Sequence, residues 1–382
     1  MRSASWLSLA LLTGCWNLEV PAEVDAVVPF VPDVGAPEGW RVDGFDMELR
    51  CPDGNPGRFY LVYPEDKAAA PDQQRELLPL AIVFHSGSFD FVGDPKANDP
   101  TSGRSYQQTL SEEKRITWEW AVNRVFATLG MYPNDDGVEY NTGALPAALA
   151  EKGIAMMLPI NCWGDWWHNR SSVEQNNFES DFFLRDGRTA AEFAYLHATT
   201  AFPPGNPLEL PIGIDANRVY LIGLGEGGRA VSELISLRET IGDTLGGFLY
   251  RPAAIVLDSP IDDLRPYYDN DSEAFQIIRS GLNRIFPAGR SFVMRGSLAF
   301  TQIGNVPARS ALMMSTSISR IPSGANDAAI QRLRDRNSPD VWIYNSVTPQ
   351  HVLSNADVNL SKSIADYLID GIGAVDPQYI SP

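Results

Sequence analysis

One stretch of the chain leads from a short apolar run directly into a cluster of glycines. Residues 219–222 are continuously apolar and rich in β-forming side chains, which is typical of a buried strand. Gly223, Gly225, Gly227 and Gly228 follow almost at once. Glycine suits places where a backbone turns sharply or approaches another segment closely. We therefore predict a buried strand, a sharp turn and then a helix.

Apolar runs of strand length alternate with helical patterns along the rest of the chain. This alternation is the pattern of a mostly parallel sheet with helices on both faces, so the predicted fold class is α/β. The chain has 382 residues, which fits one large core with insertions. The predicted strands are 44–50, 58–64, 78–84, 154–159, 219–222, 253–260, 311–314 and 341–344, and the predicted helices are 111–129, 144–152, 187–200, 327–336 and 361–369.

The N-terminus resembles a bacterial lipoprotein signal. Arg2 precedes an apolar run at 6–12, which is too short to span a bilayer, and Leu-Thr-Gly-Cys ends at Cys15. The resemblance implies that residues 1–14 are removed and that Cys15 carries a lipid in the bacterial cell envelope. Trp16 is not an acidic retention residue, which favours the outer membrane. The alternative is an uncleaved apolar N-terminus.

Composition divides the remainder of the chain into three parts. Residues 15–40 are rich in Pro, Val and Ala without a period, and we predict a tether there. Residues 41–375 form the predicted domain, in which 261–309 lack a dominant period and are interpreted as a cap over the sheet. Residues 376–382 are a tail.

The three cysteines of the chain fit the export hypothesis. If Cys15 takes a lipid, Cys51 and Cys162 remain as a pair that an oxidising compartment would allow to bond. The strands that precede them are expected to end roughly 10 Å apart, whereas a disulfide needs Cα atoms within about 7 Å. Two buried thiols are the alternative.

Residues 43–373 resemble an α/β-hydrolase, in the style of secreted esterases and serine peptidases whose elbow is G-x-S-E-G-G. The likeness rests on the frame at 223–228, its approach at 215–218, and Pro-Gln-His-Val-Leu at 349–353 after the last strand. In that family the elbow lifts a serine above the sheet. Gly225 stands at the serine's position, and a residue without a side chain can form no acyl-enzyme.

The resemblance also assigns roles to other residues. His351 matches the catalytic histidine, but the loop at 315–322, where the family sets its acid, contains no carboxylate. Asp258, one strand earlier, is either a relocated acid or the cap of the turn that follows it. His-Ser-Gly at residues 85–87 resembles one side of an oxyanion hole, with the backbone N–H of Glu226 on the other side. The oxyanion and binding residues implied are His85, Ser86, Gly87 and Glu226.

Three tryptophans, Trp163, Trp166 and Trp167, follow the predicted strand at 154–159. Open α/β sheets bind ligands at the carboxyl ends of their strands, so this cluster is either a stacking platform for a ligand or packing beneath an insertion. No motif for a metal, nucleotide or other cofactor is present. The net charge of -18 excludes the basic surface that nucleic acids need.

Two functions remain open. The first is a catalytically silent hydrolase scaffold that binds a small ester, a glycan or a peptide. The second is a live esterase or peptidase in which His351 is the base and Asp258 orients it. Its nucleophile would then be water or a displaced serine, namely Ser86, Ser88 or Ser259, since depleted triads retain about 10³ to 10⁴ of rate over the uncatalysed reaction.

Overall fold

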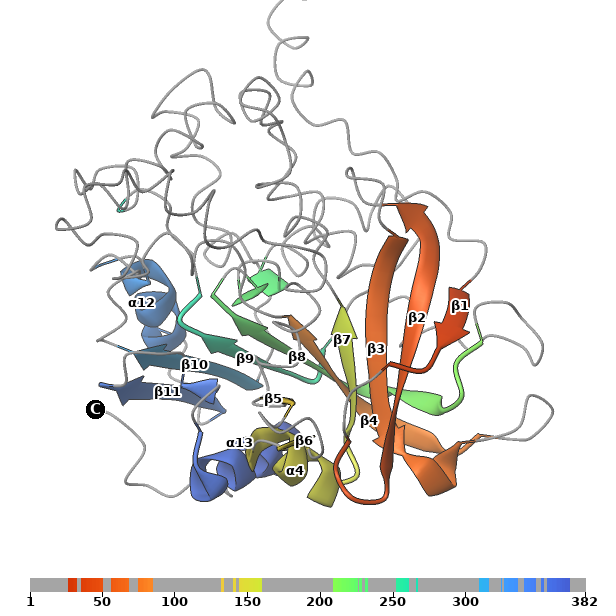
Figure 1. Cartoon of the computed structure of the whole chain (residues 1–382). Helices are drawn as coiled ribbons and strands as arrows, with labels where there is room; N and C mark the ends of the chain where they lie inside the picture. The colour runs from red at the N-terminus through yellow and green to blue at the C-terminus, as the bar shows by residue number, and fades with distance from the viewer. Residues whose placement is uncertain are drawn as a thin grey trace, which may run out of the picture.

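A nine-stranded sheet organises the part of the chain that the structure describes (Figure 1). The structure is a computed structural model, and it describes residues 27–32, 36–50, 56–68, 75–84, 132–133, 140–141, 144–159, 209–225, 227–228, 231–232, 252–260, 266, 309–315, 324, 326–335, 340–347, 352–353 and 356–371. Across the sheet the strands are β1 (Val27–Phe30), β2 (Trp40–Arg50), β3 (Pro56–Pro64), β7 (Ala155–Pro159), β4 (Leu77–Phe84), β8 (Gly213–Leu224), β9 (Ala254–Asp258), β10 (Arg309–Ser315) and β11 (Val341–Ser346).

Helices cover both faces of this sheet, as the sequence predicts. The described helices are α4 (Ala144–Glu151), α12 (Asp327–Asp335), α13 (Val358–Asp370) and the 3-10 turn η1 (Glu65–Lys67). A small ribbon pairs β5 (Tyr132–Pro133) with β6 (Tyr140–Asn141). The predicted helices at 111–129 and 187–200 lie outside the described residues, and so does the predicted cap at 261–309 apart from residue 266 and Arg309, which begins β10.

The sheet is parallel from β7 to β11 and antiparallel from β1 to β7. Strand β2 therefore runs in the same direction as β7, with the antiparallel β3 between them. This order confirms the predicted α/β class with a mostly parallel sheet. All eight predicted strands are present, and the ninth, β1, lies inside the segment predicted to be a tether.

Strand β1 belongs to the folded domain because the ring of Phe30 is seated against β2 and β3. A Cβ atom at Gly44 would lie 2.2 Å from Cζ of Phe30, so the ring occupies the place of a side chain there. The same ring meets Tyr60 edge to face at 5.9 Å, and the guanidinium carbon of Arg58 lies 4.2 Å from its centroid. The prediction of a tether at 15–40 is thus wrong for Val27–Phe30 and for Trp40, which belong to strands of the sheet.

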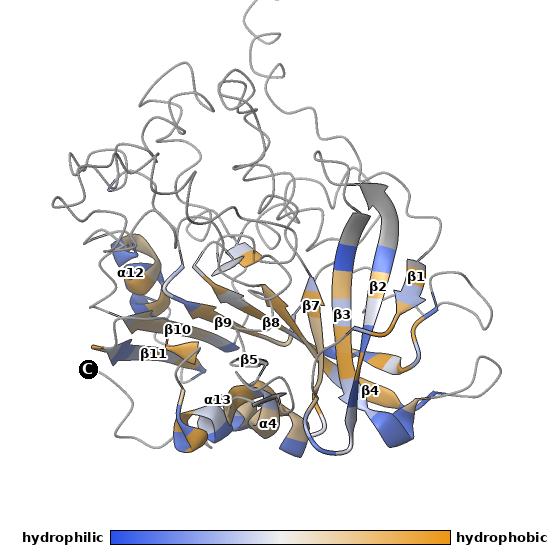
Figure 2. Cartoon of the chain, viewed as in Figure 1, coloured by the Kyte–Doolittle hydropathy of each residue, from blue (hydrophilic) through white to orange (hydrophobic). Residues whose placement is uncertain are grey.

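Each face of the sheet carries its own apolar core. On one face, Ile222 and Trp342 pack with Leu149 of α4 and Ile364 of α13. The opposite face packs Leu221, Leu257 and Leu312 against Ala329 and Leu333 of α12. Strands covered on both faces are expected to be continuously apolar, and Figure 2 shows this along β7.

Strand β8 is longer than the predicted strand at 219–222 because it consists of two paired halves. Ile214 lies opposite Leu78 and Val219 opposite Leu80, so residues 215–218 stand opposite Pro79 alone. Proline cannot donate a hydrogen bond to a strand ladder, and the register shifts there.

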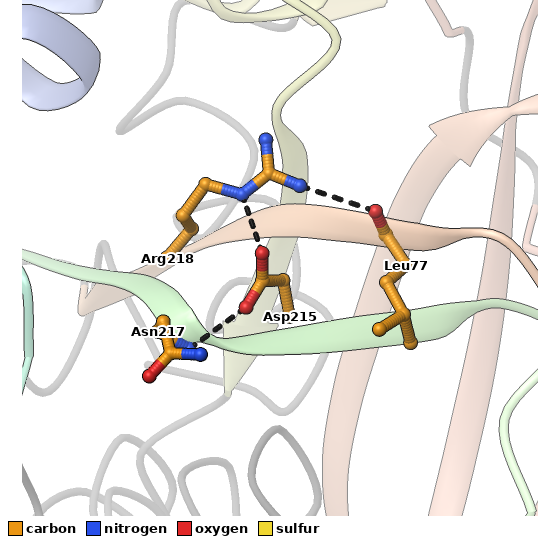
Figure 3. A network of polar contacts seen from close by, with 4 residues as sticks. All are labelled: Leu77, Asp215, Asn217 and Arg218. Carbon is orange, nitrogen blue, oxygen red and sulfur yellow. Dashed lines mark hydrogen bonds and ion pairs between the residues drawn. The ribbon is translucent and has the colours of Figure 1, made fainter.

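Asp215 holds the extra residues of β8 in place (Figure 3). Its Oδ1 accepts from the backbone N–H of Asn217 at 2.9 Å, and its Oδ2 accepts from Nε of Arg218 at 2.6 Å. Nη2 of Arg218 also donates to the carbonyl oxygen of Leu77 at 3.3 Å. The Arg218 guanidinium and the Asn217 N–H lower the pKa of Asp215. Through Arg218, residues 215–218 are also bound to Leu77 at the start of β4.

A buried carboxylate joins β2 to β3 near the amino edge of the sheet. Asp43 is 7% exposed, accepts from Nε of Arg41 at 2.7 Å and accepts from Oη of Tyr63. Burial, followed by the Asp43 carboxylate, raises the pKa of Tyr63 well above its ordinary value. A raised pKa favours the folded state below the unfolded-chain pKa of about 10, and this contribution is lost as pH rises toward the folded-state pKa.

We expect Tyr63→Phe to lower the free energy of unfolding at pH 7 by about 1 to 2 kcal/mol, because Asp43 loses a donor. The same variant should flatten the decline in stability above pH 10, since one buried phenol no longer ionises. Urea denaturation between pH 7 and 11 measures both effects.

Tyr220→Phe is the matched control, because burial raises the pKa of Tyr220 and no carboxylate bond to it is seen among the described residues. It should flatten the decline and change stability little at pH 7; identical curves for Tyr63→Phe and the parent would contradict the prediction.

Candidate functional site

The candidate site begins at the turn that follows β8. Gly225 comes directly after Leu224 and has a φ of 53°. Its backbone N–H donates to the carbonyl oxygen of Asp258 at 2.9 Å, which joins the turn to the end of β9. A residue with a side chain pays about 1 to 3 kcal/mol for such backbone geometry, whereas glycine adopts it freely. The turn therefore has the left-handed backbone expected of an elbow, with no side chain on it.

Two further glycines allow the turn to fold back on its strand. A Cβ atom on Gly223 would lie 2.5 Å from the carbonyl oxygen of Gly227 and 2.7 Å from Cα of Gly228. A Cβ atom on Gly228 would lie 2.7 Å from Cβ of Pro260, just beyond β9. Gly223 and Gly228 thus allow two backbone segments to approach each other closely, which is one of the two uses of glycine expected from the sequence.

Asp258 is the last residue of β9 and lies beside this turn. Its side chain is fully buried, and its Oδ2 accepts from the backbone N–H of Leu353 at 2.7 Å. Leu353 is two residues beyond His351 in the chain. The structure therefore brings together Gly225 of the turn, the relocated-acid candidate Asp258 and the segment that follows the histidine candidate. Their proximity is what a site assembled at the carboxyl edge of a parallel sheet requires.

Ser259 holds the neighbouring strand ends together. It is fully buried, and its φ of 46° places it in the left-handed region. Its Oγ donates to Oδ1 of Asp258 and accepts from the backbone N–H of Ser315, both at 3.1 Å. Its own N–H donates to the carbonyl oxygen of Met313 at 2.7 Å. These bonds offset the backbone strain, and a buried hydroxyl whose proton points at Asp258 is poorly placed as the displaced nucleophile.

Most of the other predicted site residues lie outside the described part of the chain. These are His351, the oxyanion candidates, the remaining displaced serines, the tryptophan cluster and the cysteines: His351, His85, Ser86, Gly87, Ser88, Glu226, Trp163, Trp166, Trp167, Cys15, Cys51 and Cys162. Their roles stay predictions.

The strands that lead to Cys51 and Cys162 end at different levels of the sheet. Arg50 of β2 pairs with Pro56 of β3, whereas Pro159 of β7 pairs with Phe59. Strand β2 thus projects past β7 by several residues of about 3.3 Å each. Cys162 lies three residues beyond Pro159 in the chain, and the disulfide stays a prediction.

Neither a metal-binding cluster nor a membrane-spanning helix occurs among the described residues. Within the ranges given above, no three His, Cys, Asp or Glu side chains gather in a way that could hold a metal ion. No helix in that part of the chain has the length and apolar character needed to cross a membrane.

Two features of the site were missed by sequence reasoning. The bond between Asp258 and Leu353 joins residues 95 positions apart, and no local pattern announces it. The left-handed φ of Ser259 falls on a residue type that rarely adopts it. The only hint of either is the dipeptide Ser-Pro directly after a buried strand that ends in aspartate.

Comparison with known proteins finds similarity among solved structures alone. No protein-family model matches the chain, and no curated protein matches its sequence. Esterase B from Lactobacillus rhamnosis is 15% identical over 86% of this chain and 81% of its own, with a TM-score of 0.47. A puromycin-hydrolysing peptidase of Mycobacterium tuberculosis is 14% identical over 87% of this chain and 39% of its own, with a TM-score of 0.49.

A prolyl endopeptidase gives a similar result, with 10% identity over 88% of this chain and a TM-score of 0.49. The chain spans 38% of the length of that enzyme. At such identities and scores, the α/β class rests on the strand order and directions of this sheet rather than on the likeness.

Proposed function

We propose that this protein is an exported, lipid-anchored binding protein built on an α/β-hydrolase-like sheet, without the acyl-enzyme chemistry of serine hydrolases. The observation that carries the proposal is Gly225. It occupies the elbow position with a φ of 53°, so the turn that would present a nucleophile is formed and bears none. Without a nucleophile on the turn, the two-step acyl transfer mechanism has no first step.

The surroundings of Gly225 support the same proposal. The loop at 315–322 contains no carboxylate, so the usual acid is missing as well. The hydroxyl of Ser259, which lies nearest in sequence to the acid candidate, is used to join β9 to β10. Two of three triad positions therefore lack the necessary group.

One observation favours a second function, that of a live hydrolase. Asp258 lies beside the elbow and binds the backbone two residues past His351. An aspartate beside a histidine-bearing segment is what a surviving acid and base pair would need. In that case His351 would activate water toward a bound ester, at the residual rate of a depleted triad.

Labelling and turnover separate the two functions. We expect the purified full chain to show no fluorophosphonate labelling and no hydrolysis of short-chain or long-chain p-nitrophenyl esters above the buffer rate. The physical reason is that no serine hydroxyl stands on the elbow. His351→Ala should behave identically to the parent. Turnover by the parent that His351→Ala abolishes would reject the binding protein in favour of the hydrolase, and an active serine esterase serves as the positive control.

Ligand contact is proposed for the edge at which β7, β8 and β9 end. Trp163, Trp166 and Trp167 follow β7 in the chain, and aromatic rings of this kind provide stacking surface for a sugar, an acyl chain or a peptide. These three classes are the candidate ligands.

A further inference from the structure

The direction of β1 shows from which edge the chain enters the sheet. Val27 pairs with Met47 and Phe30 with Gly44, so β1 runs antiparallel to β2. Strand β2 runs in the same direction as β7 and the parallel strands. The first residue of β1 therefore points to the carboxyl edge of the sheet, where β8 and β9 end (Figure 1).

The pairing registers place this entry point level with the candidate site. One row of partners crosses the sheet through Pro29, Phe45, Phe59 and Pro159, and it reaches Gly223 when the β4 and β7 register is extended by two residues. Val27 lies two residues before Pro29 of that row, and Gly225 lies two residues after Gly223. Because β1 and β8 run in opposite directions, both residues lie on the carboxyl side of the row. The chain thus enters the sheet at the height of the elbow.

The contacts of the Phe30 ring hold β1, and so the point at which the chain enters the sheet, in place. The ring fills the space above Gly44 and touches Tyr60 and Arg58, so the chain is held in the sheet from β1 onward. Only residues 16–26 then separate Cys15 from the domain. Eleven residues can span at most about 40 Å.

We propose that the carboxyl edge of the sheet, with Gly225 and Asp258, faces the membrane that holds the lipid on Cys15, and that the ligand of the site is an acyl lipid presented by that membrane. The inference rests on the proposed function, because it needs both the lipid anchor and a binding site. A short tether that leaves from the site edge keeps this edge nearest the bilayer. The net charge of -18 opposes adsorption to anionic lipid, so the tether sets the orientation.

Fluorescence energy transfer on the full lipidated chain tests the orientation. The protein is reconstituted in phosphatidylethanolamine and phosphatidylglycerol vesicles that contain rhodamine-labelled lipid. A donor dye is attached through p-acetylphenylalanine placed either at Val347, just past the carboxyl end of β11, or at Leu77, at the amino end of β4. Both side chains are apolar and exposed, at 80% and 58%, so neither replacement disturbs the core.

We expect about twofold higher transfer from position 347 than from position 77, because the length of β4 separates the two edges by about 23 Å. Equal transfer, or higher transfer from position 77, overturns the orientation. Cys15→Ser should abolish transfer at both positions; if that variant stays on the vesicles, the anchor is wrong and the proposal falls with it. Ester turnover in the assay described above would reject the silent site and leave the transfer ratio unchanged, so the two failures are distinguishable.

A titration tests the ligand class. Tryptophan fluorescence of the full chain is followed during addition of dihexanoyl-phosphatidylglycerol below its micelle concentration, of maltohexaose and of trialanine. Saturable binding of the lipid supports the proposal. Binding of the sugar or the peptide without the lipid, or no saturable change with any of the three, overturns it.

Discussion

Gly223→Ala is expected to lower the free energy of unfolding by about 3 kcal/mol or more, the upper range for forcing extra atoms into a packed interior. The new Cβ atom would lie 2.5 Å from the carbonyl oxygen of Gly227 and 2.7 Å from its carbonyl carbon. These are backbone atoms, so no flexible side chain can move aside. Urea denaturation followed by circular dichroism measures the loss.

Gly153→Ala provides the matched control for this substitution. Gly153 lies two residues beyond the end of α4 and has a φ of 68°, and a Cβ atom there would meet nothing within 4 Å. Its replacement carries only the cost of a left-handed residue, about 1 to 2 kcal/mol. If the two variants lose equal stability, the close approach of backbone at the elbow is not what Gly223 provides.

Asp258→Ala is expected to lower the free energy of unfolding by about 3 kcal/mol or more, because it leaves two buried donors without their acceptor. The donors are the N–H of Leu353 and the Oγ of Ser259. The loss should concentrate at the strand ends, so hydrogen exchange at Leu353 should accelerate more than exchange at Leu221 in the middle of β8. Urea denaturation and hydrogen exchange with mass spectrometry are the measurements.

Asp258→Asn separates the hydrogen bond from the charge. An asparagine keeps one carbonyl oxygen that can accept from Leu353, so we expect it to recover at least half of the stability that alanine loses. If Asn and Ala destabilise equally, the negative charge rather than the acceptor geometry holds the segment. If neither changes the stability, Asp258 is not the link between β9 and the residues after β11.

The α/β class and all strands from β2 to β11 that belong to the main sheet were predictable because local signals agree with the final structure. Buried parallel strands are apolar along most of their length, as β7 is throughout and β9 is up to its final residue, Asp258, and a run of that kind is visible in sequence. The glycine turn was predictable for the same reason, since Gly223 and Gly228 leave no room for side chains.

The missed parts depend on contacts between distant residues. Strand β1 has four residues, one of them proline, and it is held by its pairing with β2 and by the contact of Phe30 with Gly44. The first half of β8 contains Asp215 and Arg218, and a polar segment of this kind is not recognised as a strand from its sequence. Similarly, Asp258 is a plain strand-end aspartate until the chain returns with Leu353. Pairings of this range carry no periodic signature, so sequence patterns alone do not reveal them.

The seat of β1 also determines how the protein responds to mechanical force. The hydrogen bonds between β1 and β2 run perpendicular to the axis of β1. A pull from the N-terminal side therefore loads all of these bonds together in shear, instead of opening them one after another. The ring of Phe30 above Gly44 must also slide out of its place before the strand can leave. A strand of only four residues thus gives the sheet resistance to a pulling force at the point where the chain enters it.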